Sequence, residues 1–317
     1  MKHVIRLVSV AVLLWTPATH AQGHWESAAR LDVARAGLAV AVLDGMLYAA
    51  GGAGLTSPRA EFEVFDPSLN RWMPEAPLPR GLERFGMTAI DGRIYAAGGY
   101  APGDLGVEPT ALMWSWSPEG RVWQSETAMP GAKADFSLLA LSGRLYAIGG
   151  TRDDHRMFVF DPELRSWETI TVPDGVTRRG AAVVASEGLI YMVGGSENGE
   201  LSSRVDIYDL EADDWSRAPD LPGPSTGVAA VVHKGRIHVL GGTGLDGDQR
   251  MTLTRHASWQ PGETEWRSEA DLPTPRTAAD AAVLNDSIYL IGGGSGGGFF
   301  APFTAMDATD VFLDEAS

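Results

Sequence analysis

The segment Gly92-Arg93-Ile94-Tyr95-Ala96-Ala97-Gly98-Gly99 decides how this chain folds, because its pattern recurs along the 317 residues. A tight turn leads into a short apolar strand with a tyrosine near its centre, and a glycine pair ends the strand. The pair recurs at spacings of 47, 51, 45, 47 and 51 residues, as Gly51-Gly52, Gly98-Gly99, Gly149-Gly150, Gly194-Gly195, Gly241-Gly242 and Gly292-Gly293. A period of roughly 20 to 50 residues is typical of solenoids and propellers, so the sequence predicts a repeat architecture.

Each repeat also contains a later strand that ends in an aromatic residue, with a tryptophan soon after it. The strand-ending aromatics are Phe65, Trp116, Phe160, Tyr208, Trp259 and Phe312, and the tryptophans are Trp72, Trp123, Trp167, Trp215 and Trp266. With the apolar run that precedes each turn, such as residues 38–43, every unit holds four short strands. A four-stranded sheet cannot bury both of its faces alone, and radial stacking of the units buries them.

The sixth unit lacks its tryptophan, because only five residues follow Phe312. The missing copy is Trp25, near the other end of the chain. Leu31 lies six residues after Trp25, as Leu272 lies six residues after Trp266. A sheet without its outer strand would leave unpaired backbone groups at an edge. We therefore expect the N-terminal segment to supply the outer strand of the last unit and to close a ring.

These motifs resemble the Kelch repeat, in which a glycine pair follows an Ile/Leu-Tyr strand and an aromatic-Asp-Pro corner precedes the tryptophan. The corner appears here as Phe65-Asp66-Pro67 and Phe160-Asp161-Pro162. The resemblance implies an all-β, six-bladed β-propeller with four antiparallel strands per blade, closed by an N-terminal strand in the last blade. Six units of about 48 residues fill residues 22–317, so we expect one domain there.

Residues 1–21 have the composition of a secretory signal peptide. Lys2 and Arg6 give a positive start, and residues 7–15 are apolar but too short to span a bilayer. Thr19-His20-Ala21 supplies small residues at the cleavage site, so we expect cleavage after Ala21 and export to the periplasm or the exterior. A buried N-terminal strand is the alternative. No later stretch is apolar enough to predict a membrane span.

Charge and cysteine content exclude several classes of function. Lys and Arg number 25 and Asp and Glu 41, and a net charge of −16 opposes binding to the phosphate backbone of nucleic acids. The absence of cysteine excludes disulfides, thiolate nucleophiles, and zinc–thiolate or iron–sulfur sites. The copper oxidases of this fold use a tyrosine cross-linked to cysteine, so the resemblance does not extend to an oxidase. We expect a monomer without a cofactor.

Other motifs for phosphate, metal or nucleophile chemistry are also missing. No glycine pair precedes a helix that would present its N-terminus to a phosphate. The histidines have no close pair at ligand spacing, and no Gly-x-Ser-x-Gly elbow occurs. The sequence therefore predicts no metal site.

Cations recur where the chain enters the innermost strand of each unit. Counting ten residues back from each turn leads to Arg35, Leu82, Lys133, Arg178, Ser225 and Arg276, with Arg84 two residues after Leu82. Five units thus place a cation near one mouth of the central channel, where converging cations suit a carboxylate or sulfate. The alternative is that these cations are structural ion-pair partners.

Two acids and two loop residues complete the candidate site. Asp135 and Asp280 interrupt innermost strands whose other residues are small or apolar. Each is a candidate general base or acceptor for a ligand hydroxyl, and a salt bridge to the arginines is the alternative. Tyr100 and His155 follow glycine pairs in loops and are candidate ligand contacts. A glycine-rich stretch that ends in Phe299-Phe300 is a candidate flap.

Two classes of function remain open. The first is a binding module, whose loops around the channel take a small anion such as a sugar acid, or a peptide or glycan partner. The second is an enzyme, because the chain distantly resembles the exported sialic acid mutarotases. That resemblance implies an isomerase for an acidic sugar, with Asp135 or Asp280 as acid or base and arginines on the carboxylate. The mutarotases carry an insertion that this chain lacks, so no active residue is transferred by position.

Overall fold

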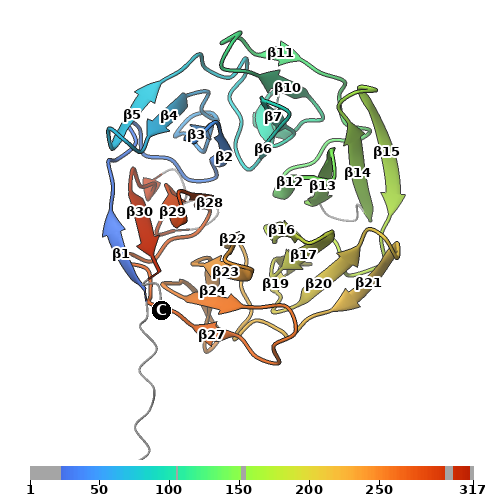
Figure 1. Ribbon diagram of the computed structural model, residues 1–317, viewed down its shortest axis with the longest axis vertical. Helices are drawn as coiled ribbons and strands as arrows, with labels where there is room; N and C mark the ends of the chain where they lie inside the picture. The colour runs from blue at the N-terminus through green and yellow to red at the C-terminus, as the bar shows by residue number, and fades with distance from the viewer. Residues whose placement is uncertain (1–22, 105, 151–154, 297–302, 315–317) are drawn as a thin grey trace, which may run out of the picture.

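The computed structural model of the protein describes residues 23–104, 106–150, 155–296 and 303–314. These residues form six four-stranded antiparallel sheets and three two-stranded hairpins, with no α-helix among them. The six sheets stand around a central opening as the blades of a propeller (Figure 1). The predicted all-β, six-bladed propeller is therefore confirmed.

In the first three blades the strands run outward from the channel in chain order. Blade 1 consists of β2 (Ala39–Leu43), β3 (Met46–Ala50), β4 (Phe62–Asp66) and β5 (Arg71–Pro74). Blade 2 consists of β6 (Gly86–Ile90), β7 (Arg93–Ala97), β10 (Met113–Trp116) and β11 (Gln124–Ser125). Blade 3 consists of β12 (Phe136–Leu141), β13 (Arg144–Gly149), β14 (Arg156–Asp161) and β15 (Ser166–Thr171).

The last three blades repeat this order, except that the outer strand of blade 6 comes from the start of the chain. Blade 4 consists of β16 (Ala182–Ser186), β17 (Leu189–Val193), β20 (Val205–Asp209) and β21 (Asp214–Arg217). Blade 5 consists of β22 (Ala229–His233), β23 (Arg236–Leu240), β26 (His256–Trp259) and β27 (Arg267–Ser268). Blade 6 consists of β28 (Asp280–Leu284), β29 (Ser287–Ile291), β30 (Thr309–Leu313) and β1 (His24–Ser27).

The turn inside each innermost hairpin has two residues with positive φ. Asp44 and Gly45 have φ values of 50° and 74°, and Asn285 and Asp286 have values of 48° and 58°. Positive φ at both positions belongs to the type I′ turn, whose twist matches that of the flanking strands. The innermost strands then pack side by side around the channel in the order β2, β6, β12, β16, β22, β28 and back to β2.

Three small hairpins extend from blades 2, 4 and 5. They are β8 (Tyr100–Gly103) with β9 (Gly106–Pro109), β18 (Ser196–Glu197) with β19 (Glu200–Leu201), and β24 (Thr243–Asp246) with β25 (Gln249–Thr252). The candidate flap at Phe299-Phe300 and the predicted signal peptide both lie outside the described residues. Within the described ranges, no helix has the length and apolar character needed to cross a membrane.

The N-terminal strand closes the ring as the sequence predicts. β1 pairs antiparallel with β30, and Trp25 lies opposite Phe312. The indole ring is 5.3 Å from the ring of Phe312, and its Nε1–H donates to the carbonyl of Ala270 at 2.9 Å. Trp123 and Trp266 make the same kind of bond to the preceding blade, each at 3.0 Å. The repeated tryptophans therefore join neighbouring blades.

Candidate functional site

Four of the predicted mouth cations lie inside the blades. The residues Arg35, Lys133, Arg178 and Arg276 are at most 2% exposed. Each donates a hydrogen bond to a carbonyl 16 residues further on, at Gly51, Gly149, Gly194 and Gly292 respectively. That carbonyl belongs to the first glycine of the repeated pair. The cation therefore ties the entry of the innermost strand to the end of the strand beside it.

Acids on the third strand of a blade neutralise three of these cations. Arg35 pairs with Glu63, and Arg276 pairs with Asp310. Arg178 pairs with Asp206 at 2.5 Å. Lys133 lies over an aromatic ring instead, with Nζ 4.8 Å from the centroid of Phe158.

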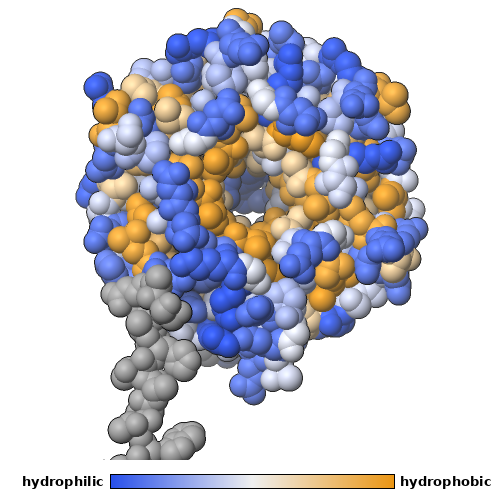
Figure 2. Space-filling view, in the orientation of Figure 1, coloured by the Kyte–Doolittle hydropathy of each residue, from blue (hydrophilic) through white to orange (hydrophobic). Residues whose placement is uncertain are grey.

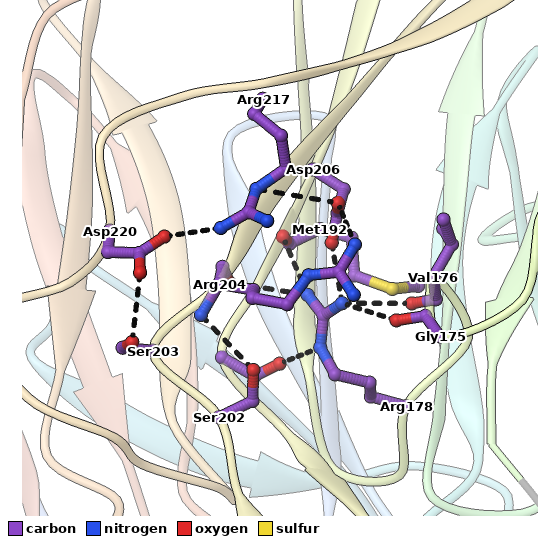
Figure 3. A network of polar contacts seen from close by, with 11 residues as sticks. Gly175, Val176, Arg178, Met192, Ser202, Ser203, Arg204, Asp206, Arg217 and Asp220 are labelled. Carbon is purple, nitrogen blue, oxygen red and sulfur yellow. Dashed lines mark hydrogen bonds and ion pairs between the residues drawn. The ribbon is translucent and has the colours of Figure 1, made fainter.

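The surroundings of Arg178 show why such a residue is unsuited to a ligand (Figure 3). Its Nη1 donates to the carbonyls of Gly175 and Val176 as well as to Asp206, and its Nη2 donates to the carbonyls of Met192 and Arg204. Burial lowers the pKa of the guanidinium, and the hydrogen bond to Asp206 opposes that shift. The expectation that Arg35, Lys133, Arg178 and Arg276 converge on the channel is not met, because all four side chains are buried and their charged groups bond inside the blades. We leave these four residues out of the candidate site.

A closed ring of six backbone hydrogen bonds lies at the mouth of the channel. Each blade supplies one residue, and its N–H donates to the carbonyl of the matching residue in the preceding blade at 2.7–3.0 Å. In order around the ring these residues are Gly37, Ala278, Gly227, Gly180, Asp135 and Arg84. We call this set the mouth ring. It joins all six blades at the point where the channel opens.

Two charged residues of the mouth ring have a backbone conformation that suits glycine. All six members have positive φ, from 52° to 68°. This conformation is easy for glycine and strained for residues with a side chain. Arg84 and Asp135 adopt it at 52° and 55°. Such strain persists where the surrounding structure enforces it, and it is concentrated at functional sites.

The mouth ring encircles a cavity of about 1130 Å³ that follows the channel between the innermost strands. Apolar residues such as Val40, Met87 and Leu138 line its depth, while Arg84, Asp135 and Arg179 line its mouth. Figure 2 shows the opening at the centre of the molecule with apolar side chains around it. The cavity has the size of a site for a small organic molecule.

Blades 2, 3 and 4 bring a charged cluster together at this mouth. Arg84 Nη1 donates to Asp135 Oδ1 at 3.1 Å, and Arg179 Nη2 donates to Asp135 Oδ2 at 2.5 Å. Arg179 Nη2 also donates to the hydroxyl of Tyr100 at 3.0 Å, and that hydroxyl donates to Asp135 Oδ2 at 3.3 Å. The side chain of Asp135 is 10% exposed, whereas those of Arg84 and Arg179 are 26% and 43% exposed. Asp135 is therefore a fixed anchor for two arginines that face the cavity.

Arg179 is the site residue that the sequence analysis missed. Counting from the turn selects Arg178, which points into the blade, while its neighbour Arg179 points into the mouth. The position of Arg179 in the repeat is the signal that could have identified it, because Arg179 directly precedes Gly180, which blade 4 contributes to the mouth ring. Glu83 holds the equivalent place in blade 2, and burial raises its pKa while Arg84 opposes the shift.

Tyr100 supports the cluster as a hydrogen-bond donor. Burial raises the pKa of its phenol, and the negative charge of Asp135 adds to the shift. The hydroxyl therefore keeps its proton at neutral pH. The predicted contact residue Tyr100 thus joins Arg84 and Asp135 as a member of the cluster.

Asp280 lies on the other side of the cavity, at the start of β28 in blade 6. Its carboxylate accepts the N–H of Val40 at 2.7 Å and that of Ala281 at 2.8 Å. Among the described residues no cation pairs with it, so the salt bridge considered for both acids forms only at Asp135. Burial raises the pKa of Asp280 to about 6, although both backbone donors oppose the shift. This acid can therefore exchange a proton near neutral pH.

His155 lines the blade 3 side of the cavity, and its Nδ1 lies 3.7 Å from the carboxylate of Asp174. Residues 151–154 beside it lie outside the described residues. The described part of the chain holds no group of three or more His, Asp or Glu side chains placed to hold a metal ion.

Comparison with known proteins finds a recognised repeat motif in three of the blades. The family described as the Kelch motif matches residues 34–79, 83–130 and 177–222. Kelch-like protein 23 of Mus musculus is 28% identical over 244 residues, which cover 74% of this chain and 41% of the relative. Beta-scruin of Limulus polyphemus is 25% identical over 220 residues, which cover 64% of this chain and 24% of the relative. The chain thus spans less than half the length of these curated relatives.

A solved structure titled "Structure of YjhT" has the same fold. It superposes with a TM-score of 0.77 at 17% sequence identity, over 90% of this chain and 96% of that one. The fold is that of a six-bladed β-propeller, and three of its blades match the Kelch motif. The Kelch motifs predicted from the sequence are therefore found in these blades.

Proposed function

We propose that this protein binds a small molecule with a carboxylate or sulfate group at the mouth of its central cavity. The observation that carries the proposal is that Asp135, on strained backbone, holds Arg84 and Arg179 so that both face the cavity. A sugar acid or an acidic glycan is the ligand class that we favour.

Both arginines keep donors for a ligand. Arg84 uses Nη1 on Asp135, and Arg179 uses Nη2 on Asp135 and Tyr100. Among the described residues, Nη2 of Arg84 and Nη1 of Arg179 have no hydrogen-bond acceptor. Planar guanidinium groups bind carboxylate and sulfate through paired N–H donors. Two such groups fixed by one acid therefore suit one anionic group.

Binding should depend on Arg84 and Arg179. We expect Arg84→Ala and Arg179→Ala each to weaken binding of D-glucuronate roughly 10- to 100-fold, because each removes a hydrogen bond to a charged group. Isothermal titration calorimetry with D-glucuronate, N-acetylneuraminate and neutral D-glucose measures this. Added salt should also lower the affinity for the acids.

The matched control is Arg144→Ala. Arg144 is 41% exposed and pairs with Asp161 and Glu168, so it resembles Arg179 in exposure and pairing but lies outside the cavity. Equal affinity of the wild type and Arg179→Ala for the acids, or equal binding of glucose and glucuronate, would contradict the proposal.

A second function, isomerisation of an acidic sugar, is favoured by Asp280. Interconversion of anomers needs a group that moves a proton between the ring oxygen and the anomeric hydroxyl. Asp280 lines the same cavity and has a pKa near 6. If the protein is such an enzyme, NMR exchange spectroscopy should show faster exchange between glucuronate anomers, and Asp280→Asn should abolish the acceleration. An unchanged exchange rate with saturating protein leaves the binding module as the function.

We further propose that the protein is exported after cleavage behind Ala21. The support is the sequence of residues 1–21, with its basic start, short apolar run and small residues at the cleavage site. Export would bring the cavity into contact with extracellular or periplasmic acidic sugars.

A further inference from the structure

Blades 5 and 6 carry threonines on their side of the mouth. Thr226, Thr243 and Thr252 of blade 5 and Thr277 of blade 6 all line the cavity. Thr226 and Thr277 directly precede the mouth-ring residues Gly227 and Ala278, so they hold the position that Arg179 holds in blade 4. Blade 5 lies opposite blade 2 in the ring of innermost strands. The mouth thus has a cationic side and a hydroxyl side.

Each of these threonine hydroxyls already donates its hydrogen to an acceptor within the protein. Thr226 Oγ1 lies 3.1 Å from the carbonyl of Arg179, Thr277 Oγ1 lies 3.3 Å from that of Gly227, and Thr252 Oγ1 lies 2.7 Å from that of Ser295. A carbonyl only accepts, so in each pair the threonine must donate. Thr243 Oγ1 lies 3.1 Å from Thr277 Oγ1, whose hydrogen is on Gly227, so Thr243 must donate as well.

These threonine hydroxyls can therefore only accept further hydrogen bonds. A hydroxyl has one hydrogen and two lone pairs, so each threonine oxygen keeps acceptor capacity. The cationic side has the opposite character, because arginine only donates. A ligand across the mouth can therefore meet the arginine donors of blades 2 and 4 and the threonine acceptors of blades 5 and 6.

We infer that Thr226, Thr243 and Thr277 determine specificity by selecting ligands that carry hydroxyl or amide hydrogens at the end remote from their anionic group. This inference rests on the proposed function and adds the direction in which the ligand binds. Its carboxylate lies on Arg84 and Arg179, and its donor groups lie on blades 5 and 6. A carboxylate whose remote end carries only acceptors leaves the threonine lone pairs unmatched.

The test compares D-glucuronate with its fully O-methylated derivative, which keeps the carboxylate and the oxygen acceptors and loses the hydroxyl hydrogens. We expect the wild type to bind glucuronate more tightly, by roughly 3- to 10-fold for each hydrogen bond lost. In Thr243→Val/Thr277→Val and in Thr226→Val, the preference for glucuronate should shrink, because valine has the shape of threonine without its oxygen. A preference that arises only from the bulk of the methyl groups would persist in these variants.

These variants should fold, since the carbonyls they release keep other donors. Gly227 O also accepts the N–H of Ala278, and Arg179 O also accepts that of Ser196. Thr169→Val on the exposed strand β15 is the control for a threonine-to-valine change away from the cavity.

The possible results distinguish this inference from the proposed function on which it rests. If glucuronate binds through Arg179 and the valine variants keep the full preference over the methylated acid, the inference is wrong and the anion site stands. If glucuronate does not bind, or binds independently of Arg179, both are overturned. A reduced preference in the valine variants and an unchanged one in Thr169→Val support the inference.

Discussion

Arg178 and Arg179 are consecutive residues with opposite environments. Arg178 is 2% exposed and pairs with Asp206, whereas Arg179 projects into the cavity and pairs with Asp135 of the neighbouring blade. In an extended segment, successive side chains point to opposite sides. One residue can therefore hold a blade together while the next forms part of the binding site.

This contrast leads to a prediction about stability. Replacing Arg178 by methionine leaves Asp206 buried without its main partner, and breaking a buried ion pair costs roughly 3–5 kcal/mol. We expect the low end of that range, because Arg204 still contacts Asp206 at 2.7 Å. Urea denaturation measures the loss, and Arg178→Met/Asp206→Leu should recover part of it. An unchanged urea midpoint together with lost glucuronate binding would show that Arg178 is a ligand residue after all.

Residue spacing predicts this site only in part, for a physical reason. The sequence pattern identifies Arg84, Asp135 and Tyr100 because they lie at recognisable positions in the repeat. The partner of Arg178 is Asp206, two residues before the strand-ending Tyr208, and Glu63 likewise stands two residues before Phe65. The repeat marks both positions, but their spacing does not show that the arginine and the acid touch. Whether an arginine faces a blade or the channel depends on which acid the fold brings beside it. That information appears only when the strands are assembled.

At the scale of the element, Trp25 of the closing strand β1 packs on His256, one of three neighbouring histidines of blade 5. The carbonyl of Ala270 accepts Nε1–H of Trp25 and lies 3.2 Å from Nδ1 of His256, so that nitrogen must carry a hydrogen. Nε2 of neutral His256 is then an acceptor, and Nδ1 of His238 donates to it at 2.8 Å. His233 lies beside His238, with 5.7 Å between ring centroids.

The closing strand itself was predictable from the repeat, while this histidine cluster was not. Trp25 has its place because every other unit contains a tryptophan there, which is a property of the sequence. His238 stands where five other blades have tyrosine, and its spacing from His256 matches no ligand motif. The two rings meet only because β23 and β26 pair in the sheet, with His238 beside Ser258 and His256 opposite Leu240.

For the whole molecule, the buried histidines predict a fold that weakens in acid. Burial lowers the pKa of His238 to about 2, with a further decrease from the nearby His256, and burial lowers the pKa of His256 to about 4. Protonation of His256 would place a hydrogen on Nε2, facing the donor of His238. In the unfolded chain both rings titrate near 6.5. Their contribution to stability is therefore complete above about pH 6.5 and is lost as the pH falls towards the folded pKa values.

Asp280 has the opposite effect on the pH dependence of stability over part of this pH range. Its pKa is raised to about 6 in the folded protein, so the folded state binds this proton more readily than the unfolded chain does. Between about pH 6 and pH 4, the unfolded chain binds about one more proton than the folded protein does, counted over His238, His256 and Asp280 together. One proton corresponds to about 1.4 kcal/mol of unfolding free energy per pH unit.

Replacing His238 by tyrosine tests the prediction with the residue that the other blades use. Five blades accommodate a tyrosine at this position, so we expect the variant to fold at pH 7. With one histidine removed, the remaining histidine and Asp280 nearly cancel, so the slope of the unfolding free energy between pH 6 and 4 should fall by about 1.4 kcal/mol per pH unit relative to the wild type. Urea denaturation of both proteins across this range measures the two slopes. Parallel slopes would mean that the acid sensitivity arises from the many surface carboxylates of this chain rather than from the histidines beside its closing strand.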